Sequence, residues 1–139
     1  MKKIIKISII SLVSLVALVL ISALVLKLIW ISNARKYAPY LFTGSTWVCN
    51  DPEIVYEVPA GYGESTAKTV VNGKEVEFEL GTLNHYVEAV KFGNDHTAID
   101  AYFTGFIIYK ENRFIIYIDK SSDQLFDGKY SKLVFYKQE

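Results

Sequence analysis

An uncharged apolar segment near the N-terminus limits the folding of this chain more than any other feature. Residues 7–26 contain no charged side chain and only four serines among apolar residues. Twenty residues at 1.5 Å each form a helix about 30 Å long, which matches the hydrocarbon core of a bilayer. Lys27 can extend its ammonium group to the lipid headgroups, and Trp30 suits the interface. We therefore predict a transmembrane signal anchor over residues 1–31, with residues 7–31 in the membrane.

Two other interpretations of this segment stay open at the sequence level. A cleaved secretory signal has a shorter apolar core, of about 7–15 residues, but Ser32-Asn33-Ala34 has the small-x-small form of a cleavage site. Cleavage after Ala34 is therefore the alternative to an anchor. A buried core helix fits less well, because the segment is apolar on all sides.

The basic residues that flank the segment predict its orientation. Three lysines and the α-amino group precede it, while Lys27, Arg35 and Lys36 follow it. The positive-inside rule favours a cytoplasmic N-terminus by a narrow margin. The expected location is the cell membrane, crossed once, with the remaining domain extracytoplasmic.

Charge is divided unevenly along the chain. The 15 basic and 15 acidic residues balance overall, but residues 1–36 hold six basic residues and no acidic one. The rest of the chain then has nine basic against fifteen acidic residues, a net charge of −6. Nucleic-acid binding needs clustered Lys and Arg, so no nucleic-acid partner is expected. An anionic lipid surface would also repel the domain, apart from its basic neck.

Beyond residue 40 the apolar pattern changes from helical to a period of two. Between residues 75 and 80, three glutamates alternate with Val76, Phe78 and Leu80, which is typical of a half-buried strand. Asn72-Gly73 suits the tight turn of a hairpin with the preceding valines. Further strands are expected at 45–50, 53–59, 84–93, 97–103, 106–110, 113–119 and 131–137, with turn residues such as Thr104-Gly105 between them.

These strands predict an all-β fold, a small antiparallel meander barrel of about eight strands behind one transmembrane helix. Closure into a barrel removes the unpaired edges of so many short strands. The barrel would occupy residues 44–139 and follow a neck over residues 32–43. We expect its core to be aromatic, since five rings fall in consecutive strands, although they could also line a pocket at one mouth. The five are Phe103, Phe106, Tyr109, Phe114 and Tyr117.

Few residues indicate chemistry. Cys49 is the single cysteine, so no intramolecular disulfide can form, and we expect it to be buried. His85 and His96 supply at most two metal ligands, and zinc needs three or four. Glu88 is in phase with its apolar neighbours and would face the interior unless a bulge turns it outward; Asp100 could serve similarly. We therefore predict no metal, no cofactor and no enzymatic activity.

Two strings in the chain support a resemblance. The segments are 44–54, GSTWVCNDPEI, and 125–136, which begins LFDGKY and ends LVFY. Together they resemble small uncharacterised exported proteins of Gram-positive bacteria, which look lipocalin-like (calycin-like). The resemblance covers residues 44–136 and implies a meander barrel with no known site; this chain lacks their lipid-attachment cysteine. A weaker likeness is to membrane-bound C-type lysozyme inhibitors, whose second cysteine is missing here.

The first functional hypothesis is a non-enzymatic binding module at the outer face of the membrane, for a small molecule or an envelope protein. Its candidate ligand-binding residues are Trp47, Tyr62, Glu88 and Tyr102. The alternative is an envelope inhibitor or immunity protein that blocks a hydrolase through loop 60–67. An inhibitor would present this loop over a packed barrel, whereas a carrier would have an open cavity lined by Phe and Tyr. An enzyme would need a histidine close to Glu88 or Asp100.

Overall fold

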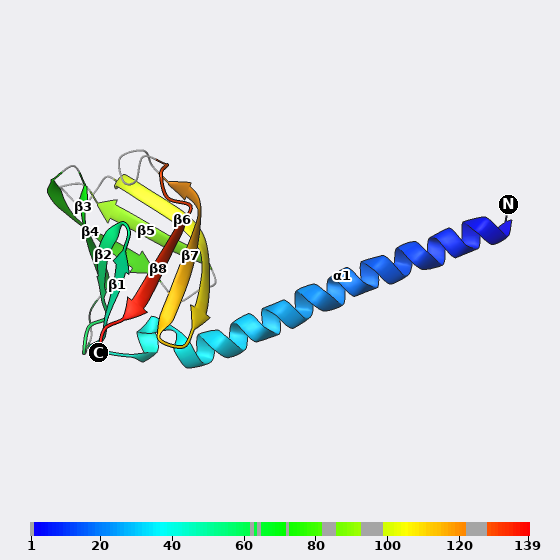
Figure 1. Cartoon of the computed structure of the whole chain (residues 1–139), viewed down its shortest axis with the longest axis horizontal. Helices are drawn as coiled ribbons and strands as arrows, with labels where there is room; N and C mark the ends of the chain where they lie inside the picture. Colours follow the sequence, from blue (N-terminus) through cyan, green and yellow to red (C-terminus); the bar gives the residue numbers. More distant parts are fainter. Residues whose placement is uncertain are drawn as a thin grey trace. The chain divides into compact units, whose positions relative to one another are not determined.

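The computed structural model describes residues 2–61, 63, 65–71, 73–81, 86–92, 99–121 and 128–139. For residues 2–8, 71, 74, 86–92 and 99–101 it describes the backbone alone. The chain divides into two compact units, Met1–Ser32 and Asn33–Glu139. The first unit lies within helix α1 (Lys2–Tyr37), and the second holds the end of α1, the short 3-10 helix η1 (Pro39–Leu41) and eight strands (Figure 1).

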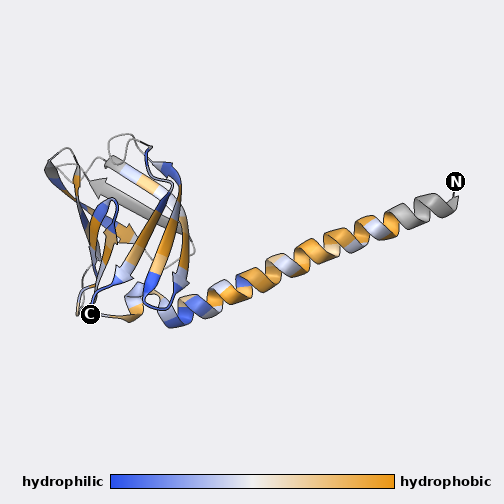
Figure 2. Ribbon diagram, in the orientation of Figure 1, coloured by the Kyte–Doolittle hydropathy of each residue, from blue (hydrophilic) through white to orange (hydrophobic). Residues whose placement is uncertain are grey.

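Helix α1 is long and apolar enough to cross a membrane, by its length and composition. Its side chains from Ile9 to Ile29 are exposed, and Figure 2 shows hydrophobic residues along its length. Ser22 Oγ donates a hydrogen bond to the Leu18 carbonyl at 2.8 Å, so this serine satisfies its hydroxyl within the helix. Such a helix is stable where lipid surrounds it, because its backbone polar groups are paired internally.

The eight strands form a closed antiparallel barrel in chain order, which confirms the predicted fold class. Each strand pairs with its neighbour in sequence, and β1 closes the barrel against β8 through the pairs Trp47↔Lys137 and Cys49↔Phe135. Closure leaves no strand edge unpaired in this order. The strands are β1 (Thr46–Asn50), β2 (Glu53–Glu57), β3 (Thr66–Val71), β4 (Lys74–Gly81), β5 (Tyr86–Phe92), β6 (Ile99–Lys110), β7 (Arg113–Ser121) and β8 (Lys132–Lys137).

Short turns fix the register of these hairpins. Val71 on β3 pairs with Lys74 on β4, and Gly73 between them has φ 75°. Lys110↔Arg113 defines a tight turn, in which Asn112 has φ 56°, a value that Asn tolerates. The bond between Asp51 and Pro52 in the β1–β2 turn is cis.

The predicted break at Thr104-Gly105 is wrong, because β6 runs through it as one strand. The register to β7 shifts at this step, so Gly105 pairs with Ile118 while Thr104 pairs with Lys120. A Cβ atom at Gly105 would lie 2.2 Å from the Tyr117 carbonyl oxygen. The glycine therefore permits close approach of two strands at a bulge and does not make a turn.

Aromatic rings fill the described interior of the barrel. Phe114 and Phe135 stack with their centroids 4.6 Å apart, and Tyr56 meets Phe114 edge-on at 5.8 Å. Phe103 and Tyr109 are buried as expected, but Phe106 and Tyr117 are 54% and 42% exposed. The expectation of a core position is wrong for these two, because they alternate with the inward residues of β6 and β7 and face outward.

Candidate functional site

Of the four predicted ligand-binding residues, the structure describes the side chains of two, Trp47 and Tyr102, and these two lie on opposite faces of the barrel wall. Trp47 is 1% exposed in the interior, where its ring packs against Phe42 and Phe114 at 6.0 and 5.4 Å. Tyr102 is 41% exposed on the outer face of β6. The barrel wall therefore separates Trp47 from Tyr102. Trp47 closes a packed interior and has no surface for a ligand.

The other predicted residues fall largely outside the described part of the chain. Tyr62 lies outside the described residues, as do His85 and His96. The backbone of Glu88 is described: it pairs with Gly81 on β4 and Thr104 on β6, and the register shift of β5 lies further along, at Lys91/Phe92. The side chains of Glu88 and Asp100 lie outside the described residues.

The described interior offers little polar chemistry. Thr69 is buried there, and its hydroxyl donates to the Glu53 carbonyl at 2.7 Å. Cys49 is buried as predicted, and burial raises the pKa of its thiol. Burial also raises the pKa of Tyr109, with the nearby Tyr40 and Tyr56 adding to the shift. Neutral thiol and phenol groups among aromatic rings suit a core and not a ligand cavity.

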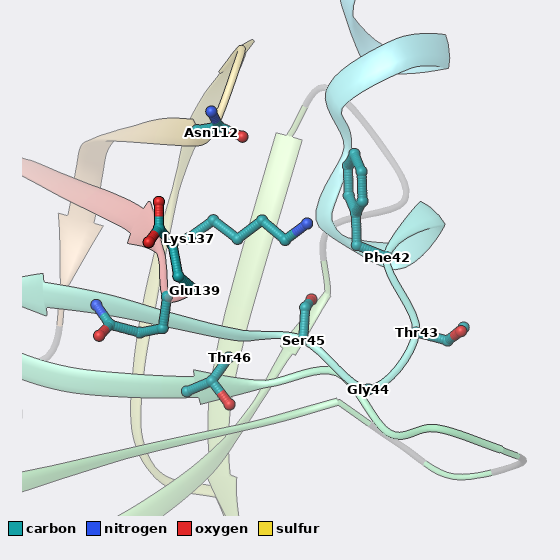
Figure 3. A pocket seen from close by; sticks show the side chains of 9 residues that line it. Phe42, Thr43, Gly44, Ser45, Thr46, Asn112, Lys137 and Glu139 are labelled. Atoms are coloured by element: carbon teal, nitrogen blue, oxygen red, sulfur yellow. The ribbon is translucent and has the colours of Figure 1, made fainter.

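A pocket of about 620 Å³ lies at the end of the barrel where β1 begins and β8 ends. Figure 3 shows Lys137 extending from β8 toward the ring of Phe42, with Ser45 beside it. The lining combines hydroxyl, amide, ammonium and carboxylate groups around one aromatic ring. It consists of Phe42, Thr43, Gly44, Ser45, Thr46, Asn112, Lys137, Gln138 and Glu139.

Backbone hydrogen bonds shape this pocket. Gly44 adopts φ 75°, which lets the chain turn sharply before β1, and its N–H donates to the Val58 carbonyl at 2.9 Å. The β8 end is held by Lys137 N–H to Asn112 O at 2.9 Å and Gln138 N–H to Thr46 O at 2.8 Å. The lining is therefore built on the barrel framework and is preformed.

Two side-chain contacts set the chemistry of the pocket. Lys137 Nζ lies 4.2 Å from the centroid of the Phe42 ring, a cation–π contact that positions the ammonium at the pocket. Trp47 Nε1 donates to Ser45 Oγ at 2.8 Å, so the Ser45 hydroxyl is oriented by the core and keeps its own proton for a ligand. The pocket thus presents a fixed cation beside an oriented hydroxyl.

Sequence reasoning missed this site. Phe42 and Lys137 are far apart in the sequence, near the two ends of the domain's chain, and only the pairing of β1 with β8 brings them together. The available signal was the Gly44-Ser45-x-Trp47 string, which marks the turn and the buried ring but not the partner strand. Ala38 and Pro39 are also buried, so the neck continues directly into the folded barrel.

Among the described residues, no group of three or more His, Cys, Asp or Glu side chains is arranged to hold a metal ion. No protein-family model matches the chain, and neither the curated proteins nor the solved structures that were compared gave a match.

Proposed function

We propose that the protein is a membrane-anchored, extracytoplasmic binding module without enzymatic activity, and that it meets its ligand at the pocket beside the neck and not in the lumen. The observation that carries this proposal is the contrast between the two places. The described interior is filled by stacked rings such as Phe114 and Phe135, whereas the pocket is a hollow of about 620 Å³ that is lined by polar groups and apolar surface in equal measure. Ligand sites are typically hollows of about 300–1,000 Å³ with a few fixed polar groups.

The lining defines the ligand class. The Lys137 ammonium favours a negative group, and the Ser45 hydroxyl with the amides of Asn112 and Gln138 suits hydroxyls and carbonyls. Glu139 can accept hydrogen bonds from hydroxyl groups of the same ligand. A hydroxylated anion, such as a cell-wall glycan fragment or a polyol phosphate, satisfies these groups together.

The anchor supports the proposed location. Helix α1 is long and apolar enough to cross a bilayer, and lysines lie at its N-terminal end. With that end in the cytoplasm, the barrel stands at the outer face of the membrane, where wall components are accessible.

A binding titration tests the proposal with the full chain in lipid nanodiscs, using muramyl dipeptide and glycerol phosphate as probes. Lys137→Ala should weaken binding of the better probe by about tenfold or more, as expected for loss of a charge-assisted hydrogen bond. Lys68→Ala is the matched control, because Lys68 is a half-exposed lysine on β3, away from the pocket, whose Nζ lies 3.9 Å from a Glu57 carboxylate oxygen. Equal affinities of the two variants, or no binding of either probe, would contradict the assignment.

An envelope inhibitor or immunity protein is the second candidate, and the packed interior favours it over a carrier. Such a protein needs a rigid scaffold rather than a cavity, and the described barrel supplies one. Inhibition assays with purified envelope hydrolases and the full chain separate this candidate from the first. Stoichiometric inhibition that survives Lys137→Ala would favour it and argue against a pocket ligand.

A further inference from the structure

The outer face of β6, β7 and β8 carries a continuous grid of side chains. Three cross-strand rows follow from the register: Phe106–Tyr117–Lys132, Ile108–Ile115–Val134 and Lys110–Arg113–Tyr136. All nine alternate with inward-facing residues, so they share the outer surface. We call these nine residues the aromatic-basic wall.

Four of the six apolar members of the wall are exposed, whereas Ile115 at its centre is buried and Val134 is half-buried. Phe106 is 54% exposed, Tyr117 42% and Tyr136 45%, and Ile108 is exposed beside them. Ile115 is only 7% exposed although it faces outward, and its register neighbours on both strands are aliphatic. Neighbouring strands lie about 4.8 Å apart, so these side chains form one patch and not scattered contacts. A contiguous exposed apolar patch on a small domain marks an interaction surface.

The charges of the barrel are sorted by wall. The aromatic-basic wall contains three basic residues and no acidic one. Strands β6 to β8 carry five basic against two acidic residues, whereas β2 to β4 carry two basic against five acidic. Glu57, Glu77 and Glu79 lie on the outer face of β2 to β4, and we call this outer face the acidic wall. The side that carries the exposed rings is therefore net basic, although Asp119 of β7 is exposed there and accepts a hydrogen bond from Thr104.

We propose that the aromatic-basic wall lies on the anionic surface of the membrane that α1 crosses. Tyr and Phe rings suit the interface, and Lys and Arg side chains reach lipid phosphates while their stems cover apolar surface. Lys132 Nζ already lies 5.8 Å from the centroid of the Tyr117 ring, so cation and ring are presented together. The acidic wall would be repelled by the same lipids, which orients the barrel.

The tether favours a lipid surface over a protein partner. Roughly 15 residues, some of them helical, separate Ile31 at the end of the predicted anchor from Thr46 at the start of β1, so the barrel stays within about 50 Å of the bilayer. A tethered surface meets its target at a millimolar effective concentration, so weak interfacial contacts suffice. This inference goes beyond the proposed ligand site, because none of the nine wall residues lines the pocket.

Fluorescence quenching by a headgroup-nitroxide lipid tests the contact with the full chain in vesicles. An environment-sensitive fluorophore is attached to Ile108→Cys on the aromatic-basic wall and, as the matched control, to Glu77→Cys on the acidic wall. The vesicles contain phosphatidylcholine, a headgroup-nitroxide lipid as quencher, and either no phosphatidylglycerol or roughly one third of it. Cys49 is 2% exposed, so protein without an introduced cysteine gives the background labelling.

We expect quenching at residue 108 to be at least about twofold stronger than at residue 77 in the anionic vesicles, and to weaken in the neutral ones. The combined change Lys110→Glu, Arg113→Glu and Lys132→Glu should reduce quenching at residue 108 to the level at residue 77, while Lys68→Glu should not. Near-UV circular dichroism of each variant establishes that the barrel is folded. A repeat with Tyr136→Cys as the label site gives an independent position on the same wall.

Three results would overturn the proposal. Equal quenching at residues 77 and 108 would show that the barrel has no preferred side toward the lipid. Quenching at residue 108 that is the same with and without phosphatidylglycerol, and the same after the charge reversal, would show that the three basic residues do not hold the wall on the lipid. Protection of the label at residue 108 that depends on protein density in the vesicles, with no lipid quenching, would assign the wall to a second copy of the chain.

Discussion

Replacement of Gly105 by alanine tests the bulge at the centre of the barrel. The added Cβ would lie 2.2 Å from the Tyr117 carbonyl oxygen and 3.0 Å from the Ile118 Cα, and both of these atoms belong to the backbone. A rotamer change cannot relieve a clash with backbone, so β6 and β7 must separate. Overpacking of this kind costs about 1–3 kcal/mol or more, and we place Gly105→Ala at about 3 kcal/mol.

The loss is measurable as a change in melting temperature. For a domain of about 100 residues, 1 kcal/mol corresponds to about 4–8 °C, so the melting temperature should fall by about 12–24 °C. Near-UV circular dichroism of the full chain in detergent micelles follows mainly the barrel, because α1 holds only Trp30 and Tyr37 of the chain's aromatic residues. Gly61→Ala is the control, because nothing lies within 4 Å of its added Cβ. A Gly105→Ala protein that melts within about 2 °C of the wild type would refute the close approach of β6 and β7 at this position.

Three further predictions concern the core. Phe114→Ala should lower stability by about 3–5 kcal/mol, because Phe114 is fully buried against three rings; urea unfolding that shows a loss below about 1 kcal/mol would contradict this packing. Burial raises the pKa of Tyr109, so the folded state holds the neutral phenol and stability should fall as pH rises above about 10, the pKa in the unfolded chain; Tyr109→Phe should flatten this alkaline decline, and an unchanged slope would count against it. Cys49 should react with a thiol reagent only as the barrel unfolds, because it is buried and its thiol pKa is raised; fast labelling of folded protein at pH 8 would disprove its placement.

Local patterns were sufficient to predict the helix and the meander. The helix follows from uninterrupted hydropathy, and the hairpins follow from period-two alternation next to turn residues such as Asn72-Gly73. These signals lie within a few residues of one another, so one strand and its turn can be recognised without the rest of the chain. In a meander each strand pairs with the next strand in the sequence, so the strand order requires no further long-range information.

Long-range features could not be predicted in the same way. Gly105 was predicted to lie in a turn. The structure needs a glycine there because the Tyr117 carbonyl on the next strand comes too close for a Cβ atom, and the local sequence does not show this. The sides taken by Phe106 and Tyr117 depend on the phase of their whole strands, which a count of aromatic residues does not give.

The candidate site depended on such features as well. The pocket needs β1 paired with β8, a contact that spans the domain and leaves no local sequence signal. The sorting of charge between two walls likewise emerges only when the register is known. The total of −6 for the domain predicted repulsion from anionic lipid, and the wall-by-wall distribution is what leads us to propose a contact instead.

Both proposals place the barrel outside the membrane on a transmembrane anchor, and thiol labelling in intact spheroplasts tests this placement. The target is Glu77→Cys, on an exposed position of the acidic wall, and the reagent is a maleimide that cannot cross membranes. An extracytoplasmic barrel should be labelled fully in intact spheroplasts, whereas protein that has only the buried Cys49 should stay unlabelled. Labelling that appears only after lysis would place the barrel in the cytoplasm and contradict both proposals.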